Sequence, residues 1–259
     1  MEEITSLMYY YIRNKLWNSL LKLCTKELKN GFDPQFVFWK AFGIFHTGSV
    51  TDAIREIEAI QNRRDIQLAA YIALAFYHAN CTYKDEQAIS AYETQISEVE
   101  SSSPDAGLIT AGYFSLFIND YQKAKTLSQI PLDRNKNYQY PDAIVLKAWV
   151  DYPSSIESGC SEQINNLNDL LQKTKHLEGM MAKFKILQAS KQLKPSEEAL
   201  NDLIISFPKF VPGLIEKTKF LLTSCEFSQI SDHVNRILNL DSNNIEAFIL
   251  KVFYTIAKE

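Results

Sequence analysis

Residues that break or cap helices recur along this sequence at intervals of about 34 residues or about twice that length. They are Pro34, Pro104, Pro141, Pro208 and the pair Asp241-Ser242, and their four successive gaps correspond to two, one, two and one such intervals. Each of the two long gaps therefore holds two units of similar size. A repeat of this length accommodates two short helices, and one pair of helices cannot bury its own apolar face. The period predicts a solenoid of stacked helix pairs, an architecture that presents long surfaces for binding.

Small residues recur where two paired helices must cross. Ala41 and Ala53 lie twelve residues apart with Gly48 between them, and Gly112 and Ala124 repeat the same spacing. A larger side chain at these positions would push the helices beyond their usual separation of about 8–10 Å. Small residues at the crossings, with Pro or Asp at the start of the next unit, are typical of the tetratricopeptide repeat. The predicted repeat-packing residues are Ala41, Gly48, Ala53, Ala73, Gly112, Ala124, Ala148 and Pro208.

Other units follow the pattern less closely. Trp17 stands where an aromatic residue opens the second helix of the first unit. We expect long loops between helices at residues 80–87 and 152–161, where the apolar periodicity is interrupted. Ala199 lies only nine residues before Pro208, where twelve are expected, so the helix crossing there is predicted to differ.

Composition supports an all-α chain. With 8 Gly and 8 Pro in 259 residues, the chain is poor in the residues that punctuate β-hairpins. No linker rich in Ser, Pro or Gly interrupts the period, so we expect one continuous array over residues 1–259. The predicted fold is a tetratricopeptide-repeat α-solenoid, a right-handed superhelix of about seven antiparallel helix pairs. Its last unit, about 243–259, is incomplete, which predicts that the chain is the N-terminal part of a longer solenoid.

Charge and apolar runs argue against several kinds of partner. The net charge is −4, and basic residues are interspersed with acidic ones, unlike the basic surface of a nucleic-acid-binding protein. The longest apolar run, residues 69–77, is far shorter than the roughly 20 residues that span a bilayer. The acidic start Met1-Glu2-Glu3 does not resemble a signal peptide. We expect an intracellular chain with no nucleic-acid partner and no direct membrane insertion. Its widely spaced cysteines, Cys24, Cys81, Cys160 and Cys225, are expected to be reduced thiols.

The sequence offers no catalytic motif. It has no phosphate-binding glycine loop, no nucleophile elbow and no His pair of the zinc-protease kind. His46 and His78 hold equivalent places near the ends of successive first helices, but a metal site needs more ligands than this pair supplies. We interpret both as ordinary helix-end histidines, and we expect neither an enzyme nor a bound cofactor or metal.

Aromatic residues are the candidates for a protein interface. Tyr9, Tyr10 and Tyr11 are consecutive, so one helix face cannot bury all three, and one or two must reach solvent or a neighbour. Tyr138 and Tyr140 flank a polar stretch before the next unit. Aromatic side chains are enriched at protein interfaces, although a Tyr at the edge of a solenoid can also simply cover the adjacent turn. The interface candidates are therefore Tyr9, Tyr10, Tyr138 and Tyr140.

Several longer segments are more specific than the general repeat pattern. They are Asp33-Pro34-Gln35-Phe36-Val37-Phe38 with Ala41-Phe42-Gly43, Ala53-Ile54-Arg55-Glu56-Ile57-Glu58-Ala59-Ile60, Val145-Leu146-Lys147-Ala148-Trp149-Val150-Asp151, Ser206-Phe207-Pro208-Lys209-Phe210, and Arg236-Ile237-Leu238 followed by Asp241-Ser242. The general pattern explains Ala53 and Pro208, but it does not ask for Leu-Lys-Ala-Trp. In this order, and over nearly the whole chain, the segments resemble the N-terminal repeats of the tetratricopeptide repeat protein 21 family, also called intraflagellar transport protein 139.

The resemblance implies a structural subunit of intraflagellar transport complex A, which acts in retrograde traffic along cilia and in the entry of membrane-protein cargo. It implies other complex A subunits, ciliary cargo and adaptor proteins as partners, and a location in the cilium and cytoplasm. It supplies no catalytic residues. Members of that family are several times longer than this chain, in keeping with the expected incomplete last unit.

Two other functions remain open at this point. A peptide-binding adaptor of the co-chaperone type would hold a terminal carboxylate with Lys, Asn and Arg on the first helices of three adjacent units. Here those helices offer mostly apolar or neutral residues, such as Ala73 and Gly112, at their crossings. The second alternative is a regulatory solenoid attached to an enzyme, which only sequence beyond residue 259 would reveal.

Overall fold

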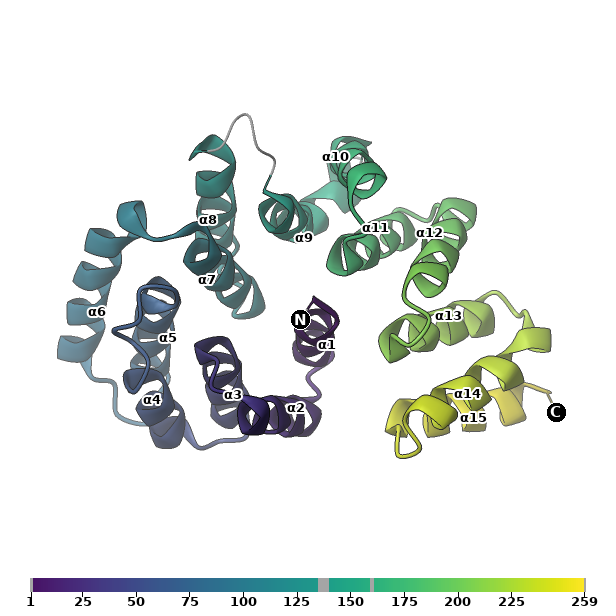
Figure 1. The fold of residues 1–259 in the computed structure, drawn as a ribbon, viewed down its shortest axis with the longest axis horizontal. Coiled ribbons are helices and arrows are strands. Elements are labelled where there is room, and N and C mark those ends of the chain that lie inside the picture. The colour runs from purple at the N-terminus through teal and green to yellow at the C-terminus, as the bar shows by residue number, and fades with distance from the viewer. Residues whose placement is uncertain (1, 135–139, 159–160, 259) are drawn as a thin grey trace. The chain divides into compact units, whose positions relative to one another are not determined.

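The computed structural model describes residues 2–134, 140–158 and 161–258, and every regular element in these ranges is a helix (Figure 1). In chain order the α-helices are α1 (Glu2–Arg13), α2 (Trp17–Asn30), α3 (Pro34–His46), α4 (Val50–Glu58), α5 (Gln67–Ala79), α6 (Glu86–Val99), α7 (Asp105–Phe117), α8 (Tyr121–Arg134), α9 (Pro141–Ser158), α10 (Ser161–Lys173), α11 (Leu177–Ala189), α12 (Leu193–Ser206), α13 (Val211–Thr223), α14 (Ile230–Leu240) and α15 (Ile245–Lys258). Single turns of 3-10 helix, η1 (Glu100–Ser102) and η2 (Phe227–Gln229), precede α7 and α14. The prediction of an all-α fold is confirmed.

The helices follow one another as pairs. Within the described residues there are seven pairs, α1/α2 to α13/α14, and α15 follows as the first helix of a further unit. Helices of one pair pack on each other, as α5 does on α6 and α7 on α8, and neighbouring pairs pack through α2 on α3 and α5 on α7. Each pair thus buries its apolar faces against its neighbours, which is the packing of an α-solenoid.

Capping residues start the helices at the places that the sequence marks. Asp33 accepts a hydrogen bond from the Gln35 backbone N at 2.9 Å, and Pro34 takes the first helical position, where its missing N–H costs nothing. Asp85 caps α6 in the same way by accepting from the Ala88 backbone N at 3.0 Å. Capping aspartates therefore help to fix where these two helices begin.

Five of the turns inside helix pairs share a residue with positive φ, two positions after the first helix ends. These residues are Lys15 (56°), Gly48 (98°), Asn119 (65°), Lys191 (59°) and Cys225 (58°). Glycine adopts this conformation freely, so the sequence revealed only Gly48. At the other four residues this backbone conformation costs of order 1–3 kcal/mol each, and the packing of the helix pair must offset that cost.

The small residues fall at equivalent places in successive pairs. Ala41, Gly112 and Ala148 are each the eighth residue of a first helix, while Ala53 and Ala124 are each the fourth residue of a second helix. All five are buried. Ala73 is buried in α5 as well, and Pro208 is exposed in a turn, where its carbonyl accepts a hydrogen bond from Arg236 Nη2 at 2.8 Å.

The structure corrects the predicted irregularity at Ala199. Helix α12 begins at Leu193, so its fourth residue, equivalent to Ala53 and Ala124, is Ser196. Ser196 is fully buried and lies twelve residues before Pro208. Because Ser is nearly as small as Ala, the crossing keeps its usual register, and Ala199 is buried one turn further along the helix.

One of the two predicted long loops is present and the other is wrong. Helix α5 ends at Ala79 and α6 begins at Glu86, which confirms the loop near residues 80–87. The loop predicted at residues 152–161 is mostly helix, since α9 continues to Ser158. The φ that proline imposes is helical, so Pro153 removes one backbone hydrogen bond without ending the helix.

The chain divides into two compact bodies. The N-terminal body is Met8–Asp151, and the C-terminal body comprises Met1–Leu7 with Tyr152–Glu259. The N-terminal body has a core rich in aromatic side chains. In the C-terminal body one apolar cluster joins α13, α14 and α15, and a second joins α11, α12 and α13.

Candidate protein-binding surfaces

The first helices of the N-terminal body converge on their own aromatic side chains. Tyr9 of α1 stacks on Tyr113 of α7 with ring centroids 4.2 Å apart, and it meets Trp39 of α3 edge-on at 5.6 Å. Phe114 of α7 lies 5.5 Å from Phe38. These rings are buried, so the inner faces of these helices stabilise the body and are not open to a peptide.

This packing corrects the interface role predicted for two tyrosines. Tyr9 is 6% exposed because the aromatic rings of Trp39 in α3 and Tyr113 in α7 pack against it. Tyr10 is 2% exposed and belongs to the core. Tyr11 is half-buried. Tyr140 is half-buried at the start of α9, where its carbonyl accepts from the Ala143 backbone N at 3.1 Å. Tyr138 lies outside the described residues.

The two helix-end histidines each have an aromatic partner of their own. His46 stacks on Trp17, with ring centroids 4.0 Å apart and planes 6° apart, and His78 lies 5.9 Å from Tyr92. Burial, helped by the nearby Lys15 charge, lowers the pKa of His46. No group of three or more His, Cys, Asp or Glu side chains within the described residues is arranged to hold a metal ion.

Three of the four cysteines are described, and they are free thiols. Cys24 is buried in α2, where desolvation raises the pKa of its thiol to about 12. Cys81 is half-buried and Cys225 is exposed. Cys160 lies outside the described residues. None of the helices in the described ranges has both the length and the apolar character needed to cross a bilayer.

A ladder of ion pairs links the first helices of the C-terminal body. Glu216 of α13 is buried and pairs with Lys185 of α11 and, at 3.5 Å, with Lys219 of its own helix. Lys219 also pairs with Glu246 of α15 at 3.0 Å. A carboxylate clamp of the co-chaperone type needs unneutralised cations on neighbouring first helices. Here Lys185 and Lys219 already meet carboxylates of the same chain, which weighs against a clamp at these two positions.

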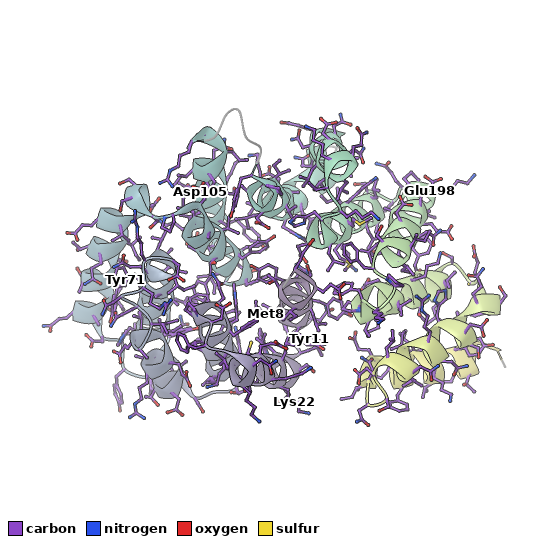
Figure 2. The ribbon with its side chains drawn as sticks, viewed as in Figure 1. Met8, Tyr11, Lys22, Tyr71, Asp105 and Glu198 are labelled. Carbon is purple, nitrogen blue, oxygen red and sulfur yellow. The ribbon has the colours of Figure 1, made fainter. Side chains whose placement is uncertain are left out.

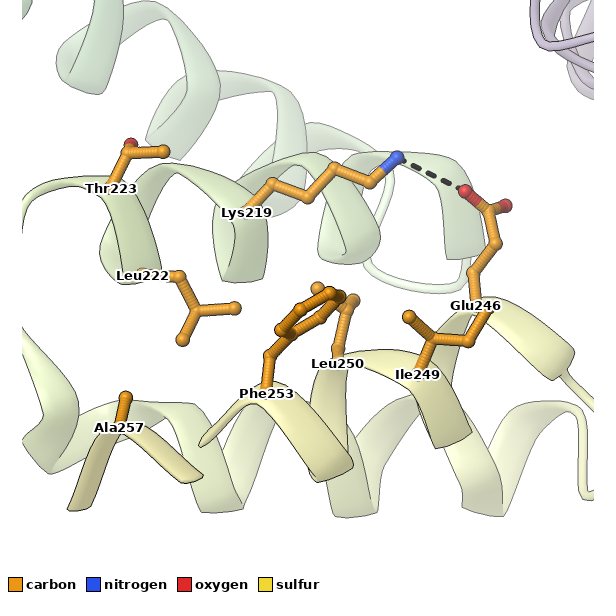
Figure 3. Close-up of a pocket in the computed structure, with 8 residues that line it drawn as sticks. All are labelled: Lys219, Leu222, Thr223, Glu246, Ile249, Leu250, Phe253 and Ala257. Carbon is orange, nitrogen blue, oxygen red and sulfur yellow. Dashed lines mark hydrogen bonds and ion pairs between the residues drawn. The ribbon is translucent and has the colours of Figure 1, made fainter. Parts of the chain in front are cut away.

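An apolar groove lies between α13 and α15. Its volume is about 480 Å³, and side chains from both helices line it: Leu222, Thr223, Ile249, Leu250, Phe253 and Ala257. The pair Lys219–Glu246 closes one end, and Phe253 points from α15 toward α13 across the groove (Figure 3). The groove therefore suits an uncharged apolar group.

Several apolar side chains of α15 outside the groove are exposed as well, and comparison with α13 shows how unusual this is. Residues of α15 follow their equivalents in α13 by one repeat length, so Phe248, Ile249 and Val252 match Leu214, Ile215 and Thr218. The α13 residues are 0%, 1% and 0% exposed, and those of α15 are 48%, 49% and 58% exposed. Ile245, Phe253 and Ile256 extend the exposed apolar surface. A contiguous apolar patch of this kind marks a docking site for another element.

Sequence reasoning missed this surface and the ion-pair ladder. A signal for the first was present, because in residues 245–258 the polar residues Lys251, Thr255 and Lys258 share one side of the helix, while apolar residues cover a wider surface than one packed face needs. The ladder joins helices of successive repeats, and no local spacing announces such a contact.

The stacked helix pairs define an α-solenoid of the tetratricopeptide-repeat kind. The chain belongs to the tetratricopeptide repeat protein 21 family, since the family's sequence model for the N-terminal ARM repeat matches residues 8–231.

Individual relatives agree with this assignment. The chain is 26% identical over its full length to Tetratricopeptide repeat protein 21B of Homo sapiens, of which it covers 20%. It is 29% identical to Tetratricopeptide repeat protein 21A of Mus musculus, over 96% of this chain and 19% of that protein. The chain thus spans about a fifth of the length of these relatives.

Solved structures show the fold alone. A tetratricopeptide repeat protein from Parabacteroides merdae superposes with a TM-score of 0.53 at 11% identity, covering 87% of this chain and 86% of that one. The Cut9–Hcn1 hetero-tetramer of the APC/C gives a TM-score of 0.50 at 14% identity, covering 97% of this chain and 48% of that one.

Proposed function

We propose that this chain is part of a structural subunit of intraflagellar transport complex A, supporting retrograde ciliary transport and the entry of cargo into cilia. The observation that carries the proposal is membership of the tetratricopeptide repeat protein 21 family over residues 8–231. The partners would be other complex A subunits and ciliary cargo or adaptor proteins, and the protein would work in the cilium and the cytoplasm. Binding would be mediated by surface side chains of a solenoid, and no step of the proposal requires catalysis.

The architecture supports a purely mechanical role. The inner faces of the first helices are occupied by aromatic rings in the N-terminal body, and in the C-terminal body Lys185 and Lys219 are paired with carboxylates. Partners would therefore bind the outer surfaces, the edges and the end of the array. A girder of this kind holds subunits at fixed spacing because each helix pair is packed between its neighbours.

We further propose that a following helix pair of the same repeat array covers the apolar face of α15, so that the repeats form one continuous solenoid. The chain itself supplies the template for such a cover. Leu214, Ile215 and Leu221 of α13 share a cluster with Ile230, Val234 and Ile237 of α14, which are spaced four and three residues apart. A helix with three apolar side chains at this spacing would bury Phe248 and Val252 in the same way.

The test is affinity purification of the tagged protein from ciliated cells, followed by mass spectrometry. Recovery of the other complex A subunits, with the tag concentrated in cilia, is the expected result. A protein that stays diffuse in the cytoplasm and recovers none of those subunits would remove the proposed role while leaving the fold and family unaffected.

A further inference from the structure

The outer face of α2 carries a stripe of lysines. Lys22, Lys26 and Lys29 are spaced four and three residues apart, so they lie on one side of the helix, and all three are exposed. Figure 2 shows Lys22 on the side of α2 that faces away from the other helices of the N-terminal body. The opposite side packs inward through Leu20 and Cys24, which are fully buried. Like charges on one helix face repel one another, so intrinsic helix stability does not favour this arrangement.

No carboxylate of the described residues forms an ion pair with this stripe. Elsewhere in the same ranges, several lysines do meet a carboxylate within 4.0 Å; they are Lys40, Lys123, Lys147, Lys185, Lys217 and Lys219. Glu27, the acidic residue of α2, is half-buried on the inward side, where its charge acts on the Cys24 thiol. The outward face of α2 is therefore uniformly positive in a chain whose net charge is −4.

This positive face is a local feature of α2 and not a general property of the second helices. Helix α6 exposes Glu86, Glu93 and Glu98 and contains no basic residue. In α4, Arg55 is paired with Asp52 at 3.5 Å. Helix α8 is also basic, but its Lys123 pairs with Glu100 and its Arg134 pairs with Asp105 at 3.0 Å. The other second helices of this body are thus acidic or largely paired, whereas the three lysines of α2 are unpaired within the described ranges.

An exposed aromatic ring follows the stripe. Phe32, three residues after Lys29, is 65% exposed, and the Arg63 guanidinium carbon lies 5.6 Å from its ring centroid. The basic face, defined as Lys22, Lys26, Lys29 and Phe32, therefore combines three cations with an apolar contact at one end.

We propose that the basic face of α2 docks an acidic segment of a partner protein, with an apolar side chain of that segment against Phe32. Carboxylates spaced four and three residues apart on a helix would match the three lysines over about 10 Å of helix axis. Anionic membranes are recognised by clusters of about 4–8 basic residues, and nucleic-acid sites need a broader basic surface. Three lysines beside an aromatic ring fit a protein partner better than either. This proposal is independent of the ciliary role.

The test uses the whole chain and a fluorescein-labelled helical peptide about four turns long, with Glu at positions 3, 7 and 10 and Leu at position 13. Fluorescence anisotropy is measured at low salt and again at physiological ionic strength, where exposed charges are screened more strongly. We expect saturable binding that weakens at the higher salt concentration. We expect K22E/K26E/K29E to weaken it by about ten-fold or more, since three attractive ion pairs are replaced by three repulsive ones. The matched control is K125E/K194E/K251E, which makes the same charge change at exposed lysines elsewhere and should leave binding unchanged.

Three outcomes would overturn the proposal. One is equal binding of a peptide with Gln in place of Glu, and another is equal loss of binding in the two triple variants. The third is stripe-dependent binding to vesicles of phosphatidylcholine and phosphatidylserine, mixed seven to three, without binding of the acidic peptide, which would assign the face to a membrane. Circular dichroism confirms that each variant is folded.

Discussion

At the scale of single residues, Gly112 shows how tightly two neighbouring pairs approach. A Cβ atom added there would lie 2.5 Å from Leu146 Cδ2 and 3.6 Å from Leu127 Cβ. The end of the Leu146 side chain can shift to admit one methyl group, so Gly112→Ala should change the free energy of unfolding by less than about 1 kcal/mol, with the better helix propensity of Ala offsetting the crowding. Gly112→Leu cannot be accommodated and should cost about 1–3 kcal/mol.

Urea unfolding of the purified chain measures both changes. Gly31→Ala is the control, because its Cβ would meet nothing within 4 Å and its φ of 171° is ordinary extended backbone. Adding Leu146→Ala to Gly112→Leu should recover part of the loss, since the two side chains compete for one space. Strict additivity of the two substitutions would contradict the assigned crossing.

The Cys24 thiol links burial to pH. Its pKa is about 12 in the folded chain, against an ordinary value of 9.0, chiefly because burial disfavours the thiolate. Between pH 9 and 12 the unfolded chain loses this proton and the folded chain keeps it, so the group leaves stability unchanged below pH 9 and lowers it above. At pH 10 the loss should be on the order of 1 kcal/mol.

Comparing the wild type with Cys24→Ala at pH 8 and pH 10 isolates this effect from other titrating groups. The wild type should lose more free energy of unfolding over that interval, and equal losses would refute the raised pKa. At pH 8, a thiol reagent should modify exposed Cys225 rapidly and Cys24 only when the surrounding helices open.

At the scale of helices, the sequence predicted features that depend on nearby residues, such as helix starts. It missed features that depend on contacts with distant helices, such as which aromatic residues are buried. Asp33-Pro34 announces the start of α3 because capping is local. Tyr9 and Tyr10 could not be assigned to the core from their own spacing, because the rings that enclose Tyr9 come from the later helices α3 and α7. The sequence predicts a loop at Pro153 because proline inside a helix removes a hydrogen bond and crowds the preceding turn, yet α9 continues through this position.

Helix α15 carries the prediction that belongs to this scale. Its exposed apolar face should make the isolated chain self-associate at micromolar concentration, because water disfavours a contiguous patch of large apolar side chains. Phe248→Lys, Val252→Lys and Ile256→Lys together should leave a monomer with unchanged thermal unfolding, since none of these side chains is buried. Sedimentation velocity measures the association state.

Three lysines introduced at Ser90, Thr94 and Ser97, on the surface of α6, provide the matched control. They add the same charge away from the apolar face and should not change the association state. Loss of self-association in the control would attribute the effect to net charge, whereas a monomeric wild type would show that the face of α15 does not drive association.

At the scale of the whole molecule, the two compact bodies predict that damage to one core is felt mainly within that body. Phe114 is fully buried among Phe38, Phe42 and Phe76, so Phe114→Ala should cost about 3–5 kcal/mol. Leu214, fully buried in the cluster of α13 and α14, provides the reciprocal variant in the other body at about 2–5 kcal/mol. In a solenoid, each helix pair is stabilised by its own packing and by its nearest neighbours.

Hydrogen exchange followed by mass spectrometry measures how far the loss of stability spreads along the chain. Phe114→Ala should accelerate exchange within residues 8–151 and change residues 177–258 much less, while Leu214→Ala should do the reverse. A uniform loss of protection in both bodies, for either variant, would mean that the chain unfolds as one cooperative unit. The reciprocal pattern would instead mean that each body keeps its own surfaces folded when the other is perturbed, so that a scaffold could lose one binding surface and retain the rest.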